Sequence, residues 1–171
     1  LLIYMLGLKN NDNKLDLEKF NEYKSQINRI LSELTEYLCI HIKNQINAGA
    51  DVVQIFDSWA GLVPEKNLEN FCYIPNKQIV EFCKREKIAN ICFPKGIKKN
   101  YEEFNIFVNP DGINLDSELD PLWAKEKLKN VVIQGGLDPT ILLKSNEEIT
   151  RAATKYIQTF KDIPYVFNLG H

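Results

Sequence analysis

The chain has 171 residues, of which 44% are hydrophobic and 26% are charged. This composition is typical of a globular domain with enough apolar material for a core, and it argues against intrinsic disorder. With 21 basic and 23 acidic residues, the formal net charge of -2 gives no field that would attract nucleic acid or an anionic membrane, although local charges can still hold a small anion.

The chain opens on its longest apolar run, LLIYMLGL, at residues 1–8. This run is far shorter than the roughly 20 residues that cross a bilayer, and it lacks the basic region and cleavage site of a signal peptide. The four cysteines, Cys39, Cys72, Cys83 and Cys92, form no C-x-x-C pair. We therefore expect reduced, mostly buried thiols in a cytoplasmic protein, without a zinc knuckle or a redox pair.

The first half of the chain begins an alternation of helices and strands. Apolar residues at helical spacing predict an amphipathic helix over 20–46, with room for one break, that ends before Gly49. The short β-branched run at 51–56 predicts a buried strand. A helix over 76–87 and a strand over 89–93 follow.

The alternation continues to the end of the chain. We predict a helix over 101–108, a strand over 112–115, and a helix that Asp120 caps and that runs to about residue 129. A strand over 131–134 follows, and then Ser145 and Glu148 form a capping box for a helix to about residue 160. The run at 165–168 is the last strand. Five strands, each preceded by a helix and with no hairpin signal, predict a parallel sheet covered by helices in one domain over residues 1–171.

Polar segments follow each predicted strand, and in parallel α/β folds ligands bind beyond these carboxyl ends. The segments are DSWAG (57–61), PKG (94–96), DSE (116–118), GGLDP (135–139) and LGH (169–171). Ser58 lacks a G-x-S-x-G elbow, so we interpret it as a hydroxyl donor rather than a nucleophile. His171 is placed to face a ligand, whereas His41 lies within the long helix and is interpreted as structural.

Other residues in these segments have two interpretations each. Asp138 before a proline is better explained as a helix N-cap than as a catalytic acid. Gly135 and Gly136 fit either a tight turn or a close approach of a ligand to the backbone. Lys95 is interpreted either as a residue that binds a carboxylate of a ligand or as part of a solvated surface.

Taken in order, the blocks VVQIFDSWAG, VVIQGGLDP and FNLGH resemble the uroporphyrinogen decarboxylase family over most of the chain from about residue 49. QGGLDP matches a family QGNLDP with Gly136 in place of Asn, and INLD resembles the family's GLD strand with Ser117 in place of an aromatic residue. The resemblance implies a (β/α)8 TIM-type barrel, of which this chain would supply about the last five strands, with sequence missing at both ends.

The resemblance also implies an activity and a set of site residues. The activity is cofactor-independent decarboxylation of the four acetate side chains of uroporphyrinogen III to coproporphyrinogen III in haem biosynthesis, by an enzyme that is a homodimer when full length. Tyr4 falls on the family's active-site tyrosine, Ser58 on a substrate-binding hydroxyl, Phe56 on an aromatic position that lines the cleft, and His171 on the histidine of NLGH. No metal is implied. The family's catalytic aspartate and its arginines lie outside this chain, so we expect the chain alone to be inactive and to expose unpaired sheet edges.

Two alternatives remain open. A corrinoid-linked methyltransferase of the same superfamily holds zinc through a His-x-Cys pair, but here Asn90 precedes Cys92 in that spacing, and the last strand ends in His rather than Cys. The other alternative is a non-catalytic remnant that binds a tetrapyrrole or a partner.

Overall fold

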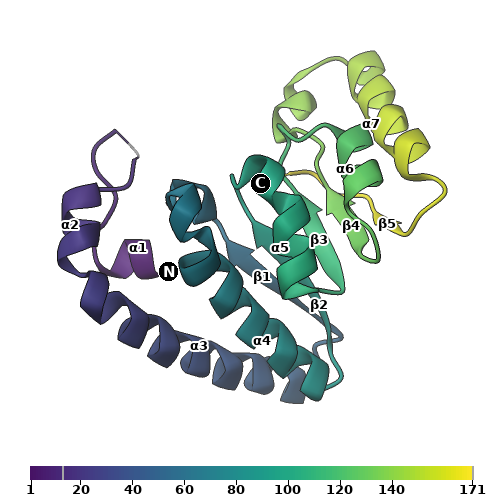
Figure 1. The fold of residues 1–171 in the computed structure, drawn as a ribbon. Helices are drawn as coiled ribbons and strands as arrows, with labels where there is room; N and C mark the ends of the chain where they lie inside the picture. The colour runs from purple at the N-terminus through teal and green to yellow at the C-terminus, as the bar shows by residue number, and fades with distance from the viewer. Residues whose placement is uncertain (13, 171) are drawn as a thin grey trace.

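Five parallel strands form one sheet in the computed structural model, which describes residues 1–12 and 14–170, apart from the side chain of residue 24 (Figure 1). The strands pair in chain order, so that each is hydrogen-bonded only to its neighbours in the sequence of strands. They are β1 (Val52–Asp57), β2 (Ala89–Pro94), β3 (Gly112–Leu115), β4 (Val132–Gly135) and β5 (Tyr165–Val166). The predicted α/β class and parallel sheet are confirmed, and only the last strand is markedly shorter than expected.

Seven α-helices are described, and four of them correspond to predicted helices with little change in their bounds. They are α1 (Leu2–Met5), α2 (Leu17–Glu22), α3 (Lys24–Asn47), α4 (Ile74–Arg85), α5 (Tyr101–Val108), α6 (Pro121–Lys127) and α7 (Asn146–Phe160). The helix expected over 20–46 breaks at Tyr23, between α2 and α3. The short helix α1 was not predicted.

The segment between β1 and α4 is irregular, and the sequence pattern did not predict its form. It consists of two 3₁₀ turns, η1 (Ala60–Leu62) and η2 (Glu65–Asn67), followed by one π-helical turn, η3 (Glu69–Tyr73). Further 3₁₀ turns, η4 (Lys98–Asn100) and η5 (Pro139–Leu143), follow β2 and β4. These turns carry the chain from strand ends into helices at one edge of the sheet.

The predicted helix starts have the hydrogen bonds that the capping residues imply. The Asp120 carboxylate accepts a hydrogen bond from the backbone N–H of Leu122 at 3.3 Å. Ser145 and Glu148 form the reciprocal capping box at the start of α7. Gly49 follows α3 with a φ of +99°, which a residue without a Cβ adopts at little cost.

The two faces of the sheet differ in how they are covered. Ile113, Leu115 and Ile133 point into the main core beneath the helices and are fully buried. On the opposite face the side chains of Phe56 and Val166 are 57% and 43% exposed. In the described residues β1 pairs only with β2, and β5 only with β4, so the sheet is open at both edges.

The cysteines are reduced and mostly buried, as expected. Cys39 is half-buried, and the other three thiols, Cys72, Cys83 and Cys92, are buried. None of the helices in the described part of the chain has the length and apolar character that a bilayer span requires.

Candidate functional site

The segments that follow the first three strands are tied to one another at the carboxyl edge of the sheet. The backbone N–H of Gly61, after β1, donates to the carbonyl of Lys95, after β2, at 2.8 Å. The N–H of Gly96 donates to the Asp116 carboxylate, after β3, at 2.7 Å. A Cβ on Gly61 would lie 2.5 Å from the carbonyl oxygen of Gly96, so the two backbones pack in direct contact. The segments that follow the strands are therefore connected to one another. We call this edge of the sheet, formed by the residues that directly follow each strand, the rim.

The rim continues to the last strand. The N–H of Gly170 donates to the carbonyl of Leu137 at 2.6 Å, and Leu169 forms a parallel bridge with Leu137. Ser117 lies close to the Cα of Gly170, because a Cβ there would be 3.4 Å from the Ser117 Cβ. His171 itself lies outside the described residues, so its predicted role is not tested.

Three aromatic rings, a lysine and a serine gather at the carboxyl end of β1. We call this set the aromatic face; its residues are Tyr4, Lys9, Phe56, Ser58 and Trp59. The Tyr4 ring is 74% exposed and its centroid lies 6.1 Å from that of Trp59. The Lys9 ammonium lies 4.8 Å above the Trp59 ring, in a cation–π contact. Ser58 is half-buried between Phe56 and Trp59 in the chain. The fold thus brings α1 and its following loop beside the residues that end β1.

The Phe56 ring is held on the open face of the sheet. Its centroid lies 6.2 Å from that of Phe93, its register partner on β2, and the two rings are nearly perpendicular at 84°. Exposed rings beside an ammonium and a hydroxyl can bind a flat, partly apolar molecule that carries anionic arms. The resemblance predicts Tyr4, Phe56 and Ser58 as site residues, but the sequence gives no signal for Lys9, which lies in a polar loop without a motif.

Asp57 lies on the helix-covered side of β1. Its carboxylate accepts a hydrogen bond from the Asn76 side chain at 3.4 Å, and the Asn76 amide also donates to the carbonyl of Cys72 at 2.8 Å. Burial raises the pKa of Asp57, and hydrogen bonds from Cys72 and Asn76 oppose that rise only in part. Asp57 therefore fastens the end of β1, and with it Ser58, to the start of α4.

The polar residues after β4 are structural. Asp138 accepts a hydrogen bond from the backbone N–H of Thr140 at 2.9 Å, and this bond lowers the pKa of the carboxyl, as expected of an N-cap. Gly135 and Gly136 have φ angles of +74° and +92°. Their carbonyls accept hydrogen bonds from the Tyr165 and Tyr156 hydroxyls, which supports the tight-turn interpretation.

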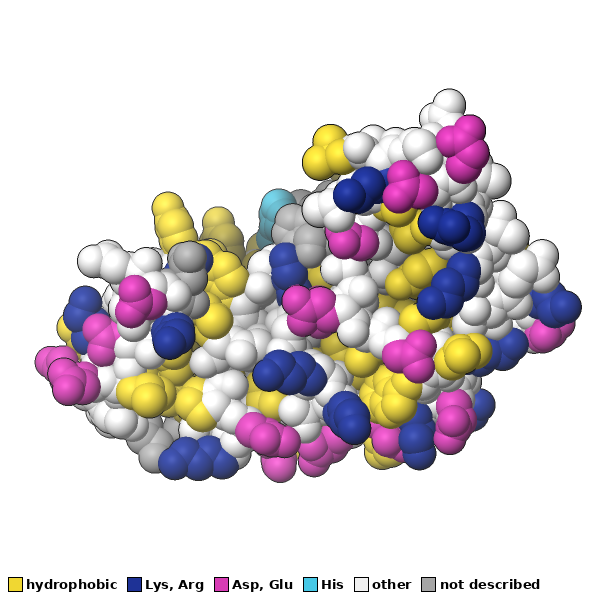
Figure 2. All heavy atoms as spheres, turned by 90° about the horizontal axis from the view of Figure 1, so that it is seen from above, with side chains coloured by type: hydrophobic (Ala, Val, Ile, Leu, Met, Phe, Trp, Pro, Cys, Tyr) yellow, Lys and Arg dark blue, Asp and Glu magenta, His cyan; other side chains and the backbone are white. Residues whose placement is uncertain are grey.

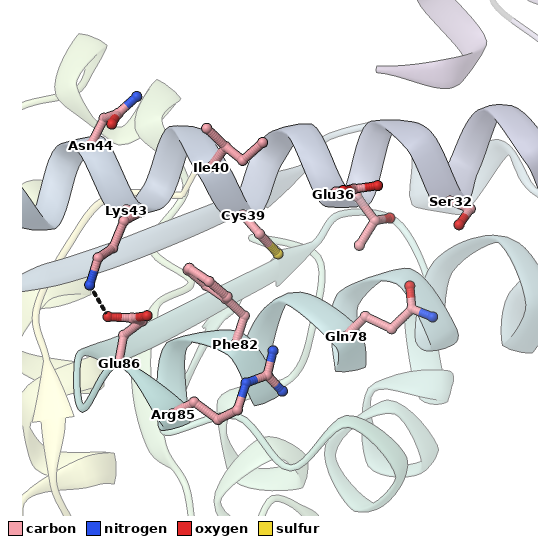
Figure 3. A pocket seen from close by; sticks show the side chains of 11 residues that line it. Ser32, Glu36, Cys39, Ile40, Lys43, Asn44, Gln78, Phe82, Arg85 and Glu86 are labelled. Atoms are coloured by element: carbon pink, nitrogen blue, oxygen red, sulfur yellow. Dashed lines mark hydrogen bonds and ion pairs between the residues drawn. The ribbon is translucent and has the colours of Figure 1, made fainter.

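A hollow of about 560 Å³ lies between α3 and α4, away from the rim (Figure 3). Figure 3 shows Cys39 and Lys43 on α3 facing Phe82 on α4 and Glu86, the residue that ends α4, with Lys43 and Glu86 joined as an ion pair. Burial raises the pKa of the Cys39 thiol, which disfavours the reactive thiolate form. His41, on the same helix, is exposed.

The described residues also bear on the zinc-dependent alternative. No three His, Cys, Asp or Glu side chains in ranges 1–12 and 14–170 gather as a metal-binding group. Cys92 is fully buried, and desolvation raises the pKa of its thiol. Its side chain belongs to the core beneath the helices, on the face away from Phe56.

Comparison with known proteins places this geometry in context. The family model described as uroporphyrinogen decarboxylase (URO-D) matches residues 1–171. The chain is 38% identical over 179 residues to uroporphyrinogen decarboxylase of Orientia tsutsugamushi, and 37% identical over 174 residues to that of Rickettsia felis. Both matches cover 100% of this chain, but 51% and 50% of those relatives. The match to the Cereibacter sphaeroides enzyme is 32% identical and covers 83% of this chain. The chain spans about half the length of the curated relatives it matches.

Proposed function

The chain belongs to the uroporphyrinogen decarboxylase family, and from this membership we propose that it supplies part of an enzyme that decarboxylates uroporphyrinogen to coproporphyrinogen. The observation that carries the proposal is the match of all 171 residues to the family, together with 38% identity to a relative that bears this name. The whole protein would act in porphyrin biosynthesis in the cytoplasm as a homodimer.

We further propose that the described strands are the last five of a (β/α)8 barrel and that residues 1–171 form part of one domain. Five parallel strands that pair in chain order, with helices on one face of the sheet, support the proposal that they form part of such a barrel. The exposed apolar side chains of Phe56 and Val166 would then face the interior of the closed barrel. The open edges at β1 and β5 are where the remaining strands would pair.

The aromatic face is the substrate-binding part of this proposal. Uroporphyrinogen is a flexible macrocycle with eight carboxylates, so rings that contact pyrroles and donors that hold carboxylates are both needed. Tyr4 and Ser58 would donate hydrogen bonds to carboxylates, Lys9 would pair with one, and Phe56 would contact the macrocycle. His171 would add a further donor, and a positive charge when protonated.

Decarboxylation itself needs a group that stabilises a cationic pyrrole. Loss of carbon dioxide from an acetate arm becomes feasible when the attached pyrrole is protonated and accepts the electron pair. A carboxylate facing the pyrrole N–H groups would stabilise this cation electrostatically. We propose that the aspartate with this role, and the arginines that clamp the carboxylates, belong to a segment outside this chain.

Reconstitution tests the proposed activity. The 171-residue chain is assayed for conversion of uroporphyrinogen, alone and mixed with the amino-terminal half of the Orientia tsutsugamushi relative, and the products are oxidised and separated by chromatography. We expect coproporphyrin only from the mixture. Turnover by the chain alone would refute the assignment of the catalytic aspartate, and a stable complex without turnover would refute the proposed activity.

Binding of uroporphyrin to the chain alone tests the aromatic face. We expect Ser58→Ala to weaken binding by about two- to tenfold, since a typical hydrogen bond contributes roughly 0.5–1.5 kcal/mol. Ser32→Ala, on α3 and exposed, is the matched control and should bind as the parent does. Equal affinities for the two variants would exclude Ser58 from the binding site.

A further inference from the structure

Ser58 lies in a short segment whose two ends are bonded to the same residue. The backbone N–H of Lys95 donates to the carbonyl of Asp57 at 3.2 Å, and the N–H of Gly61 donates to the carbonyl of Lys95 at 2.8 Å. Residues 58–60 bridge the two bonds. These bonds fix the ends of the segment, but they do not prevent it from rotating about the line that joins them. The direction of the Ser58 side chain therefore depends on further contacts.

Packing alone does not supply that direction. A cavity of about 110 Å³ lies beside the end of β1, and its lining includes Phe56, Asp57, Trp59 and Asn76. Side chains that border a cavity lack packing neighbours on that side and lose the dispersion contacts that would hold them in place. A directional hydrogen bond is needed to fix the end of the strand.

The Asn76 side chain supplies such a bond from α4. Its amide donates to the Asp57 carboxylate at 3.4 Å and to the carbonyl of Cys72 at 2.8 Å. On the face of the molecule in Figure 2, acidic side chains lie at the surface among basic ones. The Asp57 carboxylate instead has the Asn76 amide and the Cys72 thiol as hydrogen-bond partners, and both are neutral. Two directional bonds therefore hold this carboxylate.

The chemistry of Asn76 is poorly suited to packing alone. The residue is 4% exposed, and its Oδ1 atom has no hydrogen-bond partner in the part of the chain that the structure describes. A buried polar atom without a partner costs free energy that an apolar side chain of the same shape avoids. What the amide offers in return is a pair of N–H groups with a fixed direction, and both of its bonds use them.

We propose that Asn76 is a positioning residue for the hydroxyl of Ser58. By holding the Asp57 side chain, Asn76 sets the direction of the backbone at the following residue, so that the Ser58 hydroxyl points toward a bound carboxylate. The inference rests on the proposed function, because it takes Ser58 to be a donor to the substrate. Asn76 itself does not touch the ligand, so it changes the affinity only through Ser58.

A double-mutant cycle on uroporphyrin binding by the 171-residue chain tests the proposal. We expect Asn76→Ala to weaken binding by about two- to fivefold, less than the loss of the Ser58 hydrogen bond itself. In the presence of Ser58→Ala, the same substitution should have no further effect, because the two residues act as one unit. Gln78→Ala removes an exposed amide from the same helix, and this control should bind as the parent does.

A second pair of variants leaves Asn76 in place. Asp57→Ala removes the acceptor of the Asn76 hydrogen bond, whereas the amide oxygen introduced by Asp57→Asn can still accept it. Asp57→Asn should therefore recover most of the affinity that Asp57→Ala loses. Urea-induced unfolding of each variant shows whether it is folded under the conditions of the binding assay, and if Asn76→Ala is not, the Asp57 pair decides.

Failure of this inference and failure of the proposed function give different results. Equal binding by Ser58→Ala and the parent refutes the aromatic face, and the role of Asn76 with it. A loss in Ser58→Ala without a loss in Asn76→Ala leaves the proposed function standing and refutes the positioning role. Losses that add in the double variant also refute that role, since Asn76 would then act independently of Ser58. Asp57→Asn that binds as weakly as Asp57→Ala overturns the inference, because the hydrogen bond would not be what matters.

Discussion

Replacing Gly61 with alanine should disrupt the rim that holds the candidate site. The new Cβ would lie 2.5, 2.6 and 2.7 Å from the carbonyl oxygen, carbonyl carbon and Cα of Gly96. Cβ atoms approach such groups no closer than about 3.0 Å, so the two segments must separate by roughly 0.5 Å. Both sides resist, because Gly61 is hydrogen-bonded to Lys95 and Gly96 to Asp116. We expect the free energy of unfolding to fall by about 2–3 kcal/mol.

Urea-induced unfolding, followed by tryptophan fluorescence, measures this loss. Gly7→Ala is the control. Gly7 has a φ of +59°, but no atom beyond its chain neighbours would lie within 4 Å of the new Cβ, so only backbone strain of about 1 kcal/mol is expected. If Gly61→Ala costs no more than Gly7→Ala, the two segments do not pack against each other as described. The reasoning about a connected rim would then be wrong.

Three further substitutions test other parts of the structure. Because burial raises the Asp57 pKa, the folded chain keeps the carboxyl proton to a higher pH than the unfolded chain does. The contribution of this group to stability therefore falls as pH rises above about 3.9. In urea titrations, the free energy of unfolding of Asp57→Asn, relative to that of the parent, should increase between pH 4 and pH 7. Asp111→Ala should cost about 2–3 kcal/mol in the same assay, since it removes the carboxylate oxygen that accepts hydrogen bonds from both the backbone N–H and the side-chain amide of the fully buried Asn90, and a cost below about 1 kcal/mol would contradict that role. Ser145→Ala should lower the free energy of unfolding by about 1 kcal/mol, because the capping box with Glu148 is lost, and the thermal unfolding midpoint should fall accordingly. An unchanged midpoint would show that the cap contributes nothing.

Local patterns predicted most of the helices and strands because the interactions that define these elements are local. The helix over 101–108 and the strand over 112–115 have the bounds that were expected. The capping residues Asp120 and Ser145 mark their helix starts through bonds that span two or three positions. Alternation without hairpin signals was enough to predict a parallel sheet.

The irregular segment between β1 and α4 could not be predicted in this way. Its turns depend on distant contacts, such as the Phe71 ring that packs edge-on against Phe20 at 5.1 Å and the bond between Asn76 and Asp57. The break at Tyr23 likewise goes with distant contacts, because Phe20 of α2 and Ile27 of α3 pack into one cluster with Leu8. Periodicity alone does not contain this information.

The sequence by itself determined the order of the elements, the parallel sheet and the positions of Phe56 and Ser58 at a strand end, because periodicity, capping and strand polarity are properties of short stretches of chain. The tertiary structure alone decided that Tyr4 and Lys9 meet Trp59, and that the glycine backbones after β1 and β2 touch. These contacts join residues far apart in the sequence, and they form only where the packing of whole elements brings the ends of the strands together.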